Sequence, residues 1–146
     1  MPESTAHTLL ITMAALCAAY LSWQDWHHES VPIWALSLWG LLFILIALIT
    51  PPHYDTFIAL TSLSAFLYAY QWFRQKELIG FADIIVIVSL SLWIQLDIVP
   101  LFLALTGILG TATAYLLTSK RFPFLPSIFI ASAITLIFQS FNRILP

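Results

Sequence analysis

The segment PIWALSLWGLLFILIALIT, residues 32–50, contains no charged side chain and decides the class of fold. A helix needs about 17–25 predominantly apolar residues to cross a bilayer, and this segment reaches that length. Pro32 opens the run and Pro51-Pro52 closes it, as expected where proline interrupts helical hydrogen bonding. The segment therefore predicts a transmembrane helix.

Similar apolar runs fill the rest of the chain. They cover residues 8–24, 55–73, 80–97, 98–118 and 124–142. The start of the chain lacks the positive region and small-residue cleavage site of a secretory signal, so the first run is expected to remain as a helix. Because no internal repeat is evident, we expect one domain over residues 1–146. The predicted fold is an all-α polytopic membrane bundle of about six transmembrane helices.

The composition excludes several other classes of protein. Of 146 residues, 61% are hydrophobic and 8% are charged, whereas an average soluble domain carries about 25% charged residues. Five Lys and Arg residues in all are too few for a nucleic-acid surface. A single cysteine, Cys17, allows neither a disulfide framework nor a four-cysteine metal site. The expected surroundings are therefore the lipid bilayer, with no nucleic-acid partner.

The few basic residues predict how the chain is oriented. Lys and Arg that flank transmembrane helices are enriched on the cytoplasmic side. With six crossings, one face of the bundle carries Arg74, Lys76, Lys120 and Arg121, and the opposite face carries Arg143. Four basic residues against one predict that both termini lie outside the cytoplasm and that the loop over residues 23–31 lies inside.

Two of the seven acidic residues fall where water is scarce. Asp25 directly follows the first apolar run, and Asp83 lies one turn into the fourth. An ionised carboxylate costs about 2.5–3.5 kcal/mol at the bilayer centre and less near the interface. The predicted topology places both near the cytoplasmic face. If the two carboxyl groups converge, one keeps a proton while the other stays charged, which is the arrangement of an aspartic protease.

Carboxylate chemistry alone leaves other interpretations open. The two aspartates could pair separately with basic residues of the loops, or serve as proton or cation sites in a small transporter. A transporter is expected to have polar residues deep in its helices, whereas Gln71, Gln95 and Gln139 fall near predicted helix ends.

Three short motifs resemble those of the type IV prepilin peptidases, a family of membrane aspartic proteases. The stretch Asp25-Trp-His-His-Glu-Ser-Val31-Pro32 is similar to a signature in which the first catalytic aspartate precedes a proline by seven positions. Gly80-Phe-Ala-Asp83 resembles the Gly-x-Gly-Asp signature of the family. Pro123-Phe124-Leu-Pro126 is similar to its Pro-Phe-x-Pro motif. All three occur in the expected order and on the same predicted face.

The resemblance implies an activity and a substrate. Asp25 and Asp83 would be the catalytic pair, and the site would be shaped by Pro32, Gly80, Ala82, Pro123, Phe124 and Pro126. It implies no metal and no organic cofactor. The partner would be a pilin-like precursor whose cytoplasmic leader is removed, and the expected location is a bacterial inner membrane. Because a four-cysteine module is absent, the chain resembles the short, peptidase-only members.

Ala82 departs from the family signature, which has its second glycine at this position. An added methyl group could crowd the approach of another helix, or the site could need a backbone conformation that alanine adopts poorly. The alternative to an active protease is therefore a catalytically decayed scaffold or assembly protein of the same fold.

Overall fold

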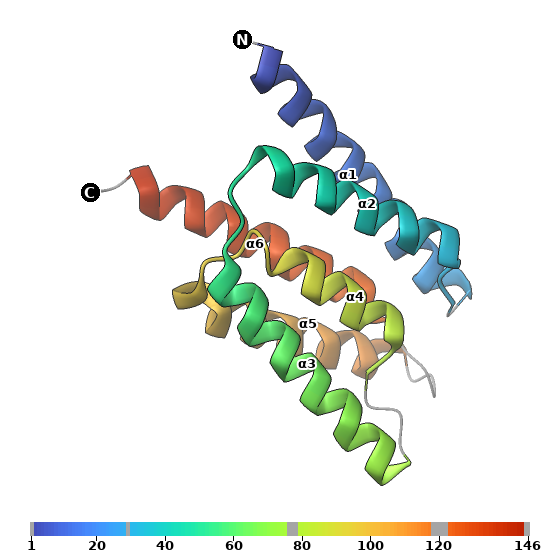
Figure 1. Cartoon of the computed structure of the whole chain (residues 1–146). Helices are drawn as coiled ribbons and strands as arrows, with labels where there is room; N and C mark the ends of the chain where they lie inside the picture. Colours follow the sequence, from blue (N-terminus) through green and yellow to red (C-terminus); the bar gives the residue numbers. More distant parts are fainter. Residues whose placement is uncertain (1, 29, 76–78, 118–122, 145–146) are drawn as a thin grey trace.

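The computed structural model describes residues 2–28, 30–75, 79–117 and 123–144, and this part of the chain is helical without any strand. The elements are α1 (Pro2–His28), α2 (Ile33–Ile49), α3 (Tyr54–Arg74), α4 (Phe81–Leu90), the 3-10 helix η1 (Leu96–Ile98), α5 (Val99–Leu117) and α6 (Leu125–Ile144). Figure 1 shows these helices as one bundle. The predicted all-α fold is confirmed.

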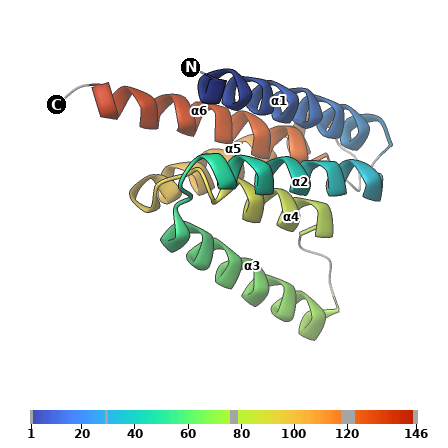
Figure 2. The same cartoon turned by 45° about the horizontal axis from the view of Figure 1, so that its top comes forward.

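Successive helices run back and forth through the bundle. The first turn of α1 and the last turn of α6 lie at the same end of the molecule in both views (Figures 1 and 2). The last turn of α1 and the first turns of α4 and α6 lie at the opposite end. We call this second end the aspartate end, because Asp25 lies in that turn of α1 and Asp83 in that turn of α4.

Three long helical segments and the apolar outer surface are those of a membrane protein. Three segments are long and apolar enough to cross a bilayer, namely Thr5–His28, Leu96–Leu117 and Leu125–Asn142. The outward-facing surface is apolar as well, since Ile33, Leu48 and Phe73 are each more than three-quarters exposed. A water-soluble monomer rarely exposes apolar surface on this scale. The protein is therefore an integral membrane protein.

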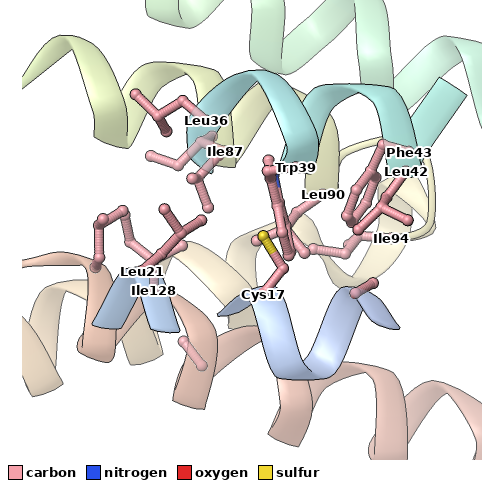
Figure 3. Close-up of a cluster of buried hydrophobic side chains, with 14 of the residues drawn as sticks. Cys17, Leu21, Leu36, Trp39, Leu42, Phe43, Ile87, Leu90, Ile94 and Ile128 are labelled. Atoms are coloured by element: carbon pink, nitrogen blue, oxygen red, sulfur yellow. The ribbon is translucent and has the colours of Figure 1, made fainter. Parts of the chain in front are cut away.

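A central core joins four of the helices. Figure 3 shows part of one buried cluster, which includes Leu21 of α1, Trp39 and Phe43 of α2, Leu90 of α4 and Ile128 of α6. The ring of Trp39 lies 4.4 Å from that of Phe43, measured between centroids. This packing holds α1, α4 and α6 in fixed relative positions, and these are the helices that meet at the aspartate end.

The predicted fourth helix, residues 80–97, was wrong in its second half. The helix ends at Leu90 and is followed by a turn and the short η1. The hydroxyl of Ser91 donates to the carbonyl of Val88 at 2.6 Å, a local bond that competes with continued helix. Ten residues of helix rise about 15 Å, half of the hydrocarbon thickness. The second half of the predicted helix is therefore a turn and a short 3-10 helix and not α-helix.

Backbone groups that this break leaves outside a helix form hydrogen bonds with neighbouring segments. The side chain of Gln139 on α6 accepts the N–H of Gln95 and donates to the carbonyl of Trp93, both at 3.2 Å. The carbonyl of Leu92 accepts the N–H of His53 at 3.0 Å. Irregular backbone at membrane depth is tolerated where protein groups satisfy it in this way. Gln139, which sequence analysis placed near a predicted helix end, thus has a structural role.

Candidate active site

Asp25 meets the beginning of α6. The carboxylate is half-buried, and its Oδ2 accepts the backbone N–H of Leu125 at 3.0 Å. Leu125 is the first residue of α6, where helical N–H groups lack partners within the helix and the helix dipole is positive. Asp25 of α1 therefore acts as an N-terminal cap for a helix one hundred positions away.

Asp83 also accepts a backbone N–H at a helix N-terminus, in this case that of its own helix, α4. It is the third residue of that helix, is half-buried, and accepts the N–H of Gly80 on Oδ2 at 3.1 Å. Asp83 also interacts electrostatically with Asp25. The structure thus brings the carboxyl groups of α1 and α4 near each other at the aspartate end, each at the N-terminus of a helix.

Gly80 precedes α4 and Pro32 precedes α2, and neither residue has unusual backbone strain. Gly80 has φ −70° and ψ 150°, a conformation that any residue adopts. A Cβ atom at Gly80 would lie 3.0 Å from Oδ2 of Asp83, so its missing side chain leaves room for the carboxylate. The carbonyl of Pro32 accepts the N–H groups of Ala35 and Leu36, which starts α2.

Ala82 is the second residue of α4 and packs against the hydrophobic core. Among the described residues, Gln75 is the one non-glycine residue with a positive φ angle. Ala82 therefore has ordinary helical backbone, and nothing in its conformation requires glycine. Of the two effects considered for this position, crowding by the methyl group is the one that remains relevant.

The third motif lies against α5. Phe124 precedes α6, and its ring occupies the space beside Gly110, where any Cβ atom would collide with it. Pro123 lies two positions before Leu125 and Pro126 directly after it, and neither proline has an N–H of its own. Sequence reasoning identified the two prolines and Phe124 but missed Leu125 and Gly110. No sequence signal pointed to them, because one acts through its backbone and the other through an absent side chain.

An apolar groove leads to the aspartate end. Its volume is about 570 Å³, and it lies between α1, α6 and the core. Small side chains line its α1 wall, and aromatic and aliphatic ones line its α6 wall, including Ala14, Ala15, Ala18, Ala19, Phe129 and Ala133. Ser22 and Pro126 also line it; Ser22 lies one helical turn before Asp25, and Pro126 directly follows Leu125.

Two indole groups in the wall of this groove have unused hydrogen-bonding capacity. Trp39 and Trp93 both line the groove, and their buried Nε1 atoms have no acceptor within the described part of the chain. Buried donors are usually paired, so these two indole groups are exceptions within the core.

The two carboxyl groups at the aspartate end suit acid–base chemistry. No group of three His, Cys, Asp or Glu side chains that could hold a metal occurs within the described residues. Lys76, Lys120 and Arg121, which supported the predicted orientation, lie outside them. Two neighbouring carboxyl groups can divide one proton between them, and such a pair can both accept and donate protons.

Comparison with known protein families gives a match over most of the chain. The sequence model of the type IV leader peptidase family matches residues 11–115, well over half of the chain. The matched region contains Asp25, Pro32, Gly80 and Asp83 and ends before Pro123. No curated protein and no solved structure gives a significant match. From the extent of the family match, the chain belongs to the type IV leader peptidase family.

Proposed function

We propose that the protein is an intramembrane aspartic endopeptidase that removes the cytoplasmic leader from pilin-like precursors, with Asp25 and Asp83 as the catalytic pair. Membership in a peptidase family supports a protease in general terms. The observation that carries the aspartic mechanism is the approach of Asp83 to Asp25 from separate helices, close enough for their charges to interact.

The proposed chemistry uses one ionised and one protonated carboxyl group. The ionised group takes a proton from a water molecule, whose oxygen attacks the carbonyl carbon of the scissile peptide bond. The protonated group donates to the carbonyl oxygen, giving a neutral tetrahedral intermediate. The group that took the proton from water then donates it to the leaving nitrogen, while the other group takes back a proton from a hydroxyl of the intermediate. The C–N bond breaks, a carboxylic acid and an amine are released, and the pair returns to its starting state. No metal or organic cofactor takes part in these steps.

The positions of the carboxyl groups suit this division of one proton. Both are half-buried, so two negative charges at this place would be poorly solvated. Each nevertheless accepts a backbone N–H at a helix N-terminus, which stabilises a single negative charge. The pair would therefore carry one charge and one proton, with the two residues sharing the acid and base roles.

The groove supplies a place for the apolar part of the substrate. A precursor with a short leader and a following hydrophobic helix would lay that helix along the small side chains of α1, such as Ala15 and Ala19. The junction between leader and helix would then reach Ser22 and Pro126, beside Asp25. In this arrangement the aspartate end faces the cytoplasm of a bacterial cell and both termini face outward.

Leader removal tests the proposal directly. The protein is co-expressed with pilin-like precursors encoded by the same cell, and processing is followed by the mobility shift that loss of the leader produces. Cleavage that depends on both Asp25 and Asp83 supports the endopeptidase. Stable binding of a precursor without cleavage would instead support a scaffold protein of the same fold.

A further inference from the structure

Phe124 and Gly110 form a close contact between α6 and α5. Gly110 is buried in the middle of α5, and the Phe124 ring fills the place where a side chain would be. A Cβ atom added to Gly110 would lie 2.9 Å from Cδ2 of the ring and closer still to Cε2. Real Cβ atoms essentially never approach other heavy atoms within 3.0 Å, so the ring would have to move.

The peptide group that follows Phe124 connects this contact to Asp25. The carbonyl of Phe124 accepts the N–H of Ile128 at 3.2 Å, which closes the first turn of α6. The N–H on the other side of the same peptide group belongs to Leu125 and donates to Asp25 at 3.0 Å. One peptide plane therefore starts the helix and holds the carboxylate.

Neighbouring residues offer few substitutes for this bond. Pro123 and Pro126 have no N–H, so a shift of the backbone by one residue toward Pro126, or by two toward Pro123, brings no new donor to Asp25. A second contact, 3.4 Å between the hydroxyls of Thr113 and Ser127, joins the same two helices one turn further along. The hydrogen bond between the Leu125 N–H and Asp25 thus depends on the packing of α6 against α5.

We propose that Gly110 is a positioning residue for Asp25: by leaving room for the Phe124 ring, it aligns the Leu125 N–H with the carboxylate. This inference rests on the proposed function, because it concerns the orientation of a proposed catalytic group. Gly110 lies outside the three motifs of the sequence and acts through Phe124 alone, without touching the site.

The chain contains a matched control for the test. Gly107 lies on the same helix, one turn before Gly110, and a Cβ atom there would have no neighbour within 4 Å. Gly107→Ala and Gly110→Ala therefore change helix propensity equally and differ in the collision with Phe124. Kinetics of precursor cleavage are measured for both variants of the purified protein in detergent.

We expect Gly107→Ala to leave kcat and KM within about twofold of the parent. Gly110→Ala should lower kcat by roughly 10- to 100-fold with little change in KM, because a misplaced carboxylate affects the chemical step more than binding. Adding Phe124→Leu to Gly110→Ala should recover much of kcat, because the smaller and more flexible side chain makes room for the new methyl group.

Several results would overturn the inference. Equal kcat values for the Gly110→Ala and Gly107→Ala variants would show that the contact does not reach the site. Additive losses in the double variant would show that Gly110 acts elsewhere than through Phe124. If Gly110→Ala does not fold, Phe124→Ala provides the test, and an unchanged kcat there contradicts the proposal. Cleavage by Asp25→Asn would refute the proposed function itself, whereas an inactive Asp25→Asn beside a fully active Gly110→Ala refutes this inference alone.

Discussion

The carboxylate of Asp25 on α1 accepts the N–H of Leu125, the first residue of α6, with oxygen and nitrogen 3.0 Å apart. This bond ties the first and last helices of the chain together at the end where Asp83 also lies. It gives a physical role to the motif around Pro123 and Pro126, which begins α6 with a backbone donor directed at a carboxylate.

Replacing either aspartate by asparagine should abolish precursor cleavage. Asparagine keeps the size of the side chain but can neither take a proton from water nor donate one as an acid, and each such role contributes roughly 10²–10⁴ in rate. Cleavage is measured for Asp25→Asn and Asp83→Asn in membranes with equal protein levels. Asp55→Asn is the control, because Asp55 is exposed in the first turn of α3, and it should cleave normally. Parental rates in either site variant would contradict the two-carboxylate mechanism.

Restoring glycine at position 82 should change activity only modestly. Ala82 has helical backbone and packs against the core, so the substitution removes one methyl group and loosens the first turn of α4. We expect Ala82→Gly to cleave at the parental rate or somewhat faster, measured beside the parent on one precursor. Cleavage by the Ala82→Gly variant combined with none by the parent would identify the natural chain as the decayed scaffold.

Filling the groove should weaken substrate binding. Ala19 lines the groove less than two turns from Asp25, so Ala19→Leu places three additional carbon atoms where the substrate helix is proposed to lie. We expect KM for the precursor to rise about tenfold while kcat changes little. Ala104→Leu on the exposed surface of α5 adds the same atoms away from the groove and should be silent. Identical kinetics for the two variants would place the substrate elsewhere.

Replacing Gln139 should destabilise the fold. Gln139→Leu keeps most of the volume but leaves the N–H of Gln95 and the carbonyl of Trp93 without their partner. Each unsatisfied buried group costs about 1–3 kcal/mol, so the thermal unfolding midpoint in detergent should fall by several degrees. The neighbouring exposed Ser140 bonds within its own helix, and Ser140→Ala provides the comparison. Equal midpoints would mean that another group satisfies the break after α4.

A reporter fused after Pro146 should be active if it requires the periplasm and inactive if it requires the cytoplasm. The reason is the distribution of basic residues, four on the face predicted to be cytoplasmic and one on the other. A second fusion, placed within the α3–α4 connection after Arg74, should give the reverse pattern. Cytoplasmic activity at Pro146 would move Asp25 and Asp83 to the outer face, and the proposal of a cytoplasmic leader would fail with it.

Local chain properties were enough to predict most of the helices and the two candidate aspartates. Long apolar runs interrupted by proline predict transmembrane helices because the bilayer fixes the required length. Asp25 and Asp83 stood out because a carboxylate is costly in such surroundings. Both conclusions depend on residue type and spacing along the chain, which the sequence contains in full.

Tertiary structure decided the features that depend on contacts between distant residues. The early end of α4 at Leu90 is sustained by Gln139, 44 and 46 positions away from the backbone groups that it satisfies. The partner of Asp25 is the backbone N–H of Leu125. Every residue except proline has such a group, so the identity of residue 125 does not indicate this role. Gly110 contributes an empty space, whose value appears only when Phe124 fills it. The roles of a backbone donor and of a missing side chain depend on which residues pack against them, and that packing exists only in the folded bundle.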